Sequence, residues 1–476
     1  MNLSRWKSLL ALLFAFSLIA AACSGDEGDD VVAEADESAE TDEGSEDEEE
    51  AMEDEEEAME DEEEAMEDEE ASLAGTTVVV TGPERDEVEG GSIQRALDVF
   101  AEANDMTIVY TGSADWEAEV NVQVEAGNPP DISYFPQPGK LADFFRNGDL
   151  LALPDATADL TAANWAEAWT VFGNVDGSQV GIPIKNDLKS LVWYKPARFE
   201  ELGYEIPETF DAFTALVTTA IDDGNTPLCV GVESGQATGW LYTDWVEEMI
   251  LRFEGPEFYD QWVAHDVPFN DERVVDQMQA VLDLWNTPGA VFAGGGSITS
   301  SHHSRDGSQG IVDNDCLMQR QASFAAGQFP EGTNFADEAD PEAIDAFYFP
   351  SNEGRPLLGA GVLAAAFADR PEVWAVMDYI SGAEYAAARQ MFQTEAAGGG
   401  NSGFLSAVNG LDQSVFNGLE QSFLGILADA DVVRFDGSDL MPADVGAGTF
   451  WTEGTSAING DQDAAAAADA IEASWP

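Results

Sequence analysis

Hydrophobic positions change period along the chain from residue 76 onward, which is the pattern of alternating strands and helices. Residues 76–81 (TTVVVT) form a run of β-branched residues, as expected for a buried strand. Ile93, Leu97 and Phe100 recur at the spacing of one helical face, and residues 107–110 form a second strand-like run. A strand, a helix and a strand predict a βαβ unit, and therefore a parallel sheet with helices on its faces.

The alternation continues through the rest of the chain. Further strands are predicted at residues 131–135, 181–184, 190–194 and 229–232. One further helix is expected between Thr209 as its cap and Gly224 as its stop, with Phe210, Phe213, Leu216 and Val217 on one face. A second helix is expected to carry Val274, Met278, Val281 and Trp285 on one face, and a third is expected from Pro371 to Ile380. We expect Asp244 and Glu247 to form the capping box of a helix that ends before Gly255. Since one sheet would be large for about 405 residues, two α/β lobes are predicted.

The N-terminal segment has the features of a secretory signal peptide. Arg5 and Lys7 are followed by an apolar run and by three alanines that end at Cys23. Residues 1–22 are therefore predicted to be the signal. Small residues before a cysteine resemble the bacterial lipoprotein processing box, in which Cys23 is lipidated. The alternative is a plain signal peptide cut near Ala22.

Residues 23–71 are predicted to be a disordered acidic tether. Residues 24–71 hold 29 Asp or Glu and no Lys or Arg, and the heptapeptide EEEAMED occurs three times between residues 48 and 68. Ala and Met are adjacent in each repeat, which gives no seam for a coiled coil. Because charged linkers repel themselves and extend, the tether could reach about 150 Å at ~3.3 Å per residue. Its spacing does not match a calcium loop with alternating oxygen ligands.

Charge narrows the classes of partner. The formal net charge is −76, and residues 72–476 still carry −49. Nucleic acid is an improbable partner, because binding it requires basic patches that release counterions. A multi-span membrane protein is excluded by the polarity of the chain. The acidity is consistent with a salty medium that screens the charges.

Few residues point to catalysis or to metal binding. HExxH and GxSxG motifs are absent, and Gly139 with Lys140 lacks the rest of a phosphate-binding loop. His302 and His303 are interpreted as part of a surface loop. We expect no enzyme activity, no cofactor and no metal. Cys229 and Cys316 remain as a pair in an oxidising compartment and are expected to form a disulfide, with two buried thiols as the alternative.

The tryptophans fall into two groups. Trp262, Trp285 and Trp374 lie on helical apolar patterns and are expected in the core. The others, Trp116, Trp240 and Trp451, lie beside polar, loop-like sequence (SADWE, ATGWLYTD, GTFWTEG). An amphipathic ring beside carboxylates suits a sugar, whose C–H face stacks on the ring while its hydroxyls donate to the acids.

Several motifs carry a family resemblance over residues 74–476. The stretches include GTTVVVTGPE, NPPDISYFPQPG, VGIPIKNDLKSLVWYKP, ATGWLYTDWVEEMILR, CLMQRQASF, RFDGSDLMP and GAGTFW. With the lipoprotein-like leader, they resemble the extracellular solute-binding proteins of ABC sugar importers, and within them the α-glucoside-binding branch. The resemblance implies two α/β lobes, a hinge and a ligand cleft between the lobes. It places lobe 1 at residues 72–184 plus 361–405 and lobe 2 at 185–360 plus 406–476, with crossings near residues 184–189, 359–361 and 403–414.

The resemblance also implies which residues line the cleft. The expected ligand-binding residues are Asp115, Trp116, Gln137, Lys185, Asn186, Trp240, Asp244, Phe324, Asp436, Asp439 and Trp451. Glu84 and Arg85 lie in a first loop that is shorter and more charged than in this branch, so their contact with ligand stays open.

The predicted function is capture of a small α-glucoside or similar sugar and its delivery to a membrane permease. Its partners would be the sugar, the ABC permease subunits and, through the lipid, the membrane, with the protein a monomer on the periplasmic or extracellular face. The alternatives are a binder of another ligand, such as a glucosylated compatible solute, and a surface-anchored glycoside hydrolase.

Overall fold

A computed structural model describes residues 72–476 except 338 and 399. The predicted signal peptide, Cys23 and the whole acidic tether lie outside the described residues. Across the part that is described, no helix combines the length and the apolar character needed to cross a membrane.

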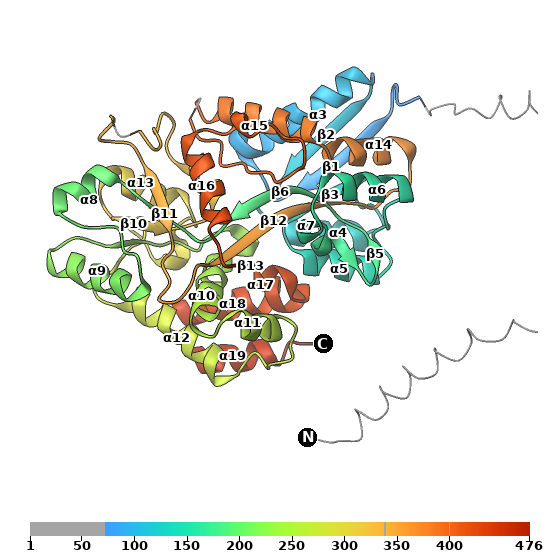
Figure 1. Ribbon diagram of the computed structural model, residues 1–476. Helices are drawn as coiled ribbons and strands as arrows, with labels where there is room; N and C mark the ends of the chain where they lie inside the picture. Colours follow the sequence, from blue (N-terminus) through green and yellow to red (C-terminus); the bar gives the residue numbers. More distant parts are fainter. Residues whose placement is uncertain (1–71, 338, 399) are drawn as a thin grey trace, which may run out of the picture. The chain divides into compact units, whose positions relative to one another are not determined.

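The first half of the fold is built on a six-stranded mixed sheet (Figure 1). Its strands are β1 (Thr77–Gly82), β2 (Thr107–Gly112), β3 (Ile132–Phe135), β6 (Ile182–Leu188), β12 (Pro356–Ala366) and β13 (Val432–Phe435). The predicted βαβ unit is confirmed, because β1 pairs in parallel with β2, with Val78 opposite Ile108, through α3 (Gly91–Ala103). The sheet is not purely parallel, since β12 runs antiparallel to both β3 and β6.

Helices cover both faces of this sheet. On one face, Val78 and Val80 share a core with α3, α14 (Pro371–Ile380) and α15 (Ala383–Ala396). On the other, Phe135 packs with α4 (Trp116–Glu125) and α5 (Pro138–Arg146). Remaining elements of this half are α6 (Asp155–Asn164), α7 (Glu167–Thr170) and the β4 (Asn174–Val175) to β5 (Ser178–Gln179) hairpin.

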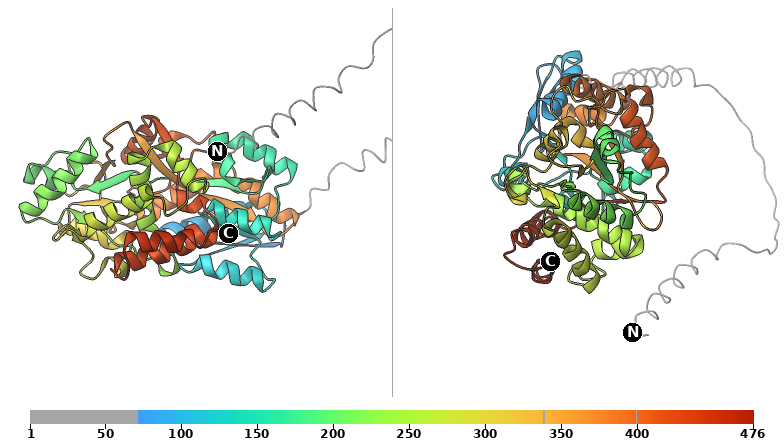
Figure 2. Two further views of the ribbon diagram at one scale, coloured as in Figure 1. Left: turned by 90° about the horizontal axis from the view of Figure 1, so that it is seen from below. Right: turned by 90° about the vertical axis from the view of Figure 1, so that its left-hand side faces the viewer.

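The second half is built on a five-stranded sheet of order β11-β7-β10-β8-β9. These strands are β7 (Leu191–Tyr194), β8 (Leu228–Cys229), β9 (Val291–Phe292), β10 (Met318–Arg320) and β11 (Asp345–Tyr348). The accompanying helices are α8 (Pro196–Leu202), α9 (Phe210–Asp222), α10 (Trp240–Phe253), α11 (Pro256–Val263), α12 (Glu272–Asn286), α13 (Arg305–Asp313), α16 (Gly418–Ala428), α17 (Gly437–Leu440), α18 (Phe450–Ile458) and α19 (Ala464–Glu472). The C-terminal helices α18 and α19 share a core with α10 and α12. Figure 2 shows these C-terminal helices in red.

Three of the segments that join the two halves lie side by side. The strand β6 ends at Leu188 and β7 begins at Leu191, so the chain passes directly from one sheet to the other. Asn186 lies opposite Gly361 of β12 and forms an isolated bridge with Leu405. The three segments predicted to cross therefore meet at Asn186. The exact lobe bounds, 72–184 plus 361–405 and 185–360 plus 406–476, stay a prediction.

Of three local features predicted from the sequence, two are confirmed and one is wrong. The Thr209 cap is confirmed, because its side chain accepts a hydrogen bond from the Ala212 N–H at 3.1 Å. The predicted Asp244–Glu247 capping box is wrong, since α10 begins at Trp240 and both acids are buried within it. The predicted disulfide is confirmed, with the Cα atoms of Cys229 and Cys316 5.5 Å apart.

Candidate functional site

A cavity of about 180 Å³ lies between the two halves, at the strands that connect them. The first half contributes Glu84, Arg85, Glu89, Glu117 and Gln137, the connecting strands contribute Lys185, Asp187, Lys189 and Gly361, and the second half contributes Ser234, Trp240, His303, Phe324, Asp436, Ser438, Asp439 and Trp451. Most of these side chains are almost wholly buried, so the cavity lies within the protein and is not a depression on its surface.

Lys185 holds together the acids at the first-half end of the cavity. Its Nζ lies 3.4 Å from Glu84 Oε1, 3.4 Å from Asp187 Oδ2 and 3.8 Å from Glu89 Oε1. Burial opposes ionisation of Glu84, but Arg389 and Lys185 outweigh it and lower its pKa. Burial raises the pKa of Glu89 to about 7, and Glu84 and Asp86 add to the rise.

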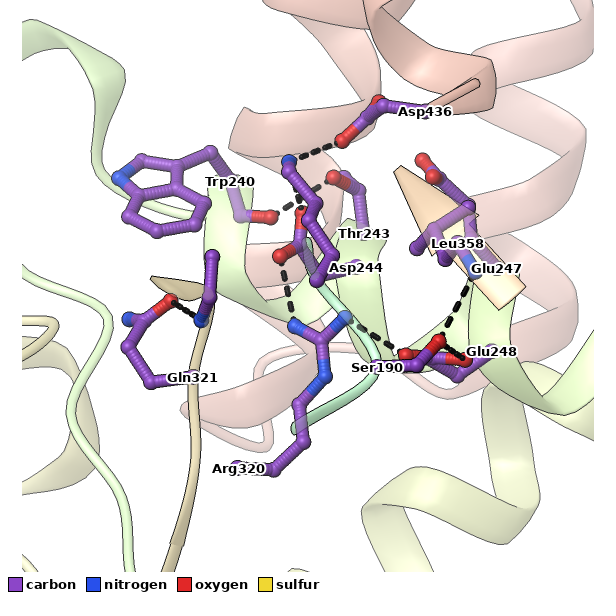
Figure 3. Close-up of polar contacts among 12 residues, drawn as sticks. Ser190, Trp240, Thr243, Asp244, Glu247, Glu248, Arg320, Gln321, Leu358 and Asp436 are labelled. Carbon is purple, nitrogen blue, oxygen red and sulfur yellow. Dashed lines mark hydrogen bonds and ion pairs between the residues drawn. The ribbon is translucent and has the colours of Figure 1, made fainter. Parts of the chain in front are cut away.

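A buried charge network forms the second-half end (Figure 3). Lys189 Nζ is 2.8 Å from Asp244 Oδ1 and also pairs with Asp436. Arg320 donates to Asp244 Oδ2 at 2.6 Å and to Glu248 Oε1 at 3.0 Å. Because all five side chains are nearly inaccessible to water, their charges must be compensated within the protein.

The network fixes the start of α17 at the cavity wall. Glu247 accepts hydrogen bonds from the backbone N–H groups of Gly437 (2.9 Å) and Ser438 (3.0 Å), and Asp436 caps the helix by accepting from the Asp439 N–H (2.9 Å). The Asp439 carboxylate accepts no hydrogen bond and makes no ion pair with any described residue, although only 8% of the residue is exposed. Burial raises its pKa well above the usual range, and Asp436 adds to the rise. Because no described residue occupies it, this carboxyl group is free to form hydrogen bonds with a ligand's hydroxyls.

Aromatic rings form the wall beside these acids. Trp240, at the first residue of α10, is half-buried, and its ring centroid lies 4.9 Å from that of His303 and 6.1 Å from that of Phe324. Lys189 Nζ lies 5.4 Å from the Trp240 ring centroid. Burial lowers the pKa of His303 well below its usual value, and the neighbouring His302 lowers it further. A neutral imidazole and an indole face suit an uncharged ligand with an apolar side.

The cavity brings together seven of the eleven residues predicted from the sequence. These are Gln137, Lys185, Trp240, Phe324, Asp436, Asp439 and Trp451. Glu84 and Arg85, whose position the sequence left open, also lie on its wall.

The other four predicted residues do not line the cavity. Trp116 is in the core, because it begins α4 and its ring packs edge-on against Phe135 and donates from Nε1 to Ser133 Oγ at 3.0 Å. Asn186 holds the connecting segments together by accepting from the Ala407 N–H at 2.7 Å. Asp244 lies behind Lys189 in the charge network, and the exposed Asp115 follows the lining residue Ala114.

Several lining residues were not predicted from the sequence. Glu89, Glu117, Asp187, Lys189 and His303 are the charged or imidazole side chains among them, and the interpretation of His303 as part of a surface loop is wrong. One local signal was present, because Lys185 and Lys189 stand between the predicted strands 181–184 and 190–194, where a buried charge is costly unless paired. In the part of the chain that is described, no three His, Cys, Asp or Glu side chains form a metal-binding group.

Comparisons with known proteins agree on one class. A family described as bacterial extracellular solute-binding protein matches residues 86–387. The osmoprotective compounds-binding protein GgtB of Synechocystis sp. is 35% identical over 405 residues, which cover 84% of this chain and 91% of that protein. The alpha-glucosides-binding periplasmic protein AglE of Rhizobium meliloti is 34% identical over 418 residues, or 85% and 88% of the two chains.

Solved structures show the same fold at low sequence identity. The solute receptor AcbH, described as preferring β-D-galactopyranose, aligns with a TM-score of 0.69 at 18% identity and covers 84% of this chain and 98% of that one. RafE in complex with raffinose aligns with a TM-score of 0.64 at 18% identity, with the same coverage. The two-lobe α/β fold predicted from the sequence is therefore confirmed.

Proposed function

The chain belongs to the bacterial extracellular solute-binding proteins and serves an ABC sugar transporter, and we propose that the sugar it captures is a small α-glucoside. The observation that carries this proposal is the second-half wall of the cavity. There, the half-buried ring of Trp240 lies near the acids Asp436 and Asp439, and Asp439 has no hydrogen bond or ion pair to its carboxyl group from any residue that the structure describes. A sugar ring can stack on the indole while its hydroxyls donate to the acids. The alpha-glucosides-binding relative supports the choice of sugar.

A glucosylated compatible solute is the second candidate. It is favoured by the 35% identity to a protein named for osmoprotective compounds, and the same ring and carboxylates would hold its glucosyl part. A thermal-shift screen with maltose, sucrose, trehalose and glucosylglycerol, followed by calorimetry, separates the two candidates. Stabilisation by glucosylglycerol alone would contradict the first.

We also propose that the protein binds and releases its sugar without changing it. Its relatives over most of the chain are named as binding proteins. Incubation with each disaccharide and analysis of the products is the test, since release of glucose would indicate the glycoside hydrolase considered above.

Trp240→Ala is expected to weaken sugar binding by about tenfold to a hundredfold. Burying a large apolar side chain contributes ~1.5 to 3 kcal/mol, and 1.4 kcal/mol corresponds to a tenfold change in affinity. Calorimetry with the tightest-binding sugar of the screen measures the loss. The matched control is Trp285→Ala, in the second-half core and only 4% exposed. It should lower the free energy of unfolding by ~3 to 5 kcal/mol and leave affinity nearly unchanged. Unchanged affinity in Trp240→Ala would show that the sugar does not stack there.

We further propose that Cys23 is lipidated and that residues 24–71 act as an extended spacer between the membrane and the folded part. The processing-box resemblance and the run of like charges support this. Cys23→Ser is expected to release the protein from membranes, as measured by fractionation and immunoblotting. Deletion of residues 48–68 serves as the control and should change neither membrane retention nor sugar affinity. Full retention of Cys23→Ser would contradict lipidation.

A further inference from the structure

Beside the cavity, α5 of the first half meets the segment that follows α17 of the second half. A Cβ atom built on Gly139 would lie 1.9 Å from the backbone oxygen of Met441 and 3.0 Å from that of Leu440. Real Cβ atoms essentially never come within 3.0 Å of such an atom. Four residues further along α5, Asp143 Oδ2 accepts a hydrogen bond from the Ala443 N–H at 2.8 Å. The two backbones therefore approach as closely as glycine allows.

The elements that meet here also form opposite walls of the cavity. Gln137 immediately precedes α5 and Asp439 lies in α17, and both line the cavity while being only 5% and 8% exposed. The contact between Gly139 and Met441 therefore depends on the relative position of the two walls. Any separation of the halves that moves Gln137 away from Asp439 also separates Gly139 from Met441.

The contact is local and is not part of a continuous core. A second cavity of about 210 Å³ lies directly beside it, lined by Gly139, Asp143 and Phe172 from one half and by Leu440 and Pro442 from the other. Because a core is close-packed, this gap shows that the two halves do not pack continuously at this contact.

We propose that this seam, Gly139 and Asp143 against residues 440–443, forms when the two halves close on the sugar, and that Gly139 and Asp143 are positioning residues for binding. The inference rests on the proposed function, since it assumes a ligand that enters between the halves. A methyl group at position 139 would overlap Met441 only in the closed arrangement. It would not disturb the first half alone, where Ala is the better helix former within α5.

The test uses Gly139→Ala in the full mature chain, with the tightest-binding of maltose, sucrose and trehalose as the probe. Affinity for the sugar is expected to fall roughly a hundredfold or more, because apparent affinity scales with the population of the competent state. The melting temperature without sugar should stay unchanged. Small-angle scattering should show a decrease in radius of gyration on adding sugar to the wild type but not to the variant. The matched control is Gly425→Ala, an exposed helical position whose Cβ would meet nothing within 4 Å.

Asp143→Ala is a second test of the same proposal, for use if Gly139→Ala is unstable. Loss of the Ala443 hydrogen bond should weaken sugar binding roughly tenfold while leaving the melting temperature without sugar in place. A lowered melting temperature with retained affinity, in either variant, would show that the seam is permanent packing and would overturn the inference. Sugar binding by the wild type without compaction would overturn it as well. If the wild type binds none of the sugars, the proposed function itself fails.

Discussion

Arg320→Met is expected to lower the free energy of unfolding by about 3 to 5 kcal/mol, because it removes a counter-charge that two buried acids share, although Asp244 keeps its ion pair with Lys189 and Glu248 keeps its ion pair with Arg252. Arg320 is fully buried and its guanidinium pairs with both Asp244 and Glu248. Each carboxylate would lose a charge-assisted hydrogen bond in a region that water does not reach. Urea denaturation with linear extrapolation measures the change.

The control for this substitution is Arg146→Met. Arg146 pairs with Asp176 at 3.1 Å, but both side chains are more than half exposed. Exposed pairs contribute about 0 to 1 kcal/mol, so this variant should be close to the wild type. If both variants lose the same small amount, the buried network is not a source of stability. Arg320→Lys should recover only part of the loss, since an ammonium group cannot span two carboxylates as a planar guanidinium does.

This network also explains where sequence reasoning failed. Asp244 and Glu247 were interpreted as the capping box of a helix, whereas both are buried within α10. Acids are rarely buried without partners, and those of Asp244 are Lys189, 55 residues before it, and Arg320, 76 residues after it. No local pattern indicates such a pairing, which depends on how the two sheets are placed.

Elements with a strong period of hydrophobic residues could be predicted from the sequence. The β1-α3-β2 unit follows from a β-branched run, a helical stripe and a second run, because each buries one face by its own geometry. Short strands could not. The strand β8 covers only Leu228–Cys229, whereas residues 229–232 were predicted, because the neighbours β9 and β10 decide where pairing ends.

Residues that line the cavity could be predicted only where they stand in a motif that resembles the family. Trp240 and Trp451 stand in stretches that resemble the family, and both line the cavity. The resemblance also placed Trp116 in the cleft, and its neighbours are equally polar, yet its ring turns inward to Phe135 at the first turn of a helix over the sheet. Polar neighbours in sequence therefore do not decide which side of an element a ring occupies.

Removing the disulfide by the double substitution Cys229→Ala with Cys316→Ala is expected to lower the free energy of unfolding by about 4 to 5 kcal/mol. The two residues are 87 positions apart, so the bond closes a long loop that contains α10 to α13. Such a closure restricts the unfolded chain in proportion to the logarithm of loop length. Alanine is chosen because both sulfur atoms are buried, and a serine hydroxyl would add an unpaired polar group there.

Sugar affinity should be nearly unchanged in this double variant, because neither cysteine lines the cavity. The bond instead links β8 to the residue two positions before β10, beside α13, where Gly310 leaves room for the Cys316 sulfur. A reductant should lower the melting temperature of the wild type toward that of the double variant and should have no effect on the double variant itself. The melting temperature of the wild type could instead stay unchanged after complete reduction, as verified by thiol labelling. That result would show that the loop stays ordered in the unfolded ensemble and that the bond contributes little to stability.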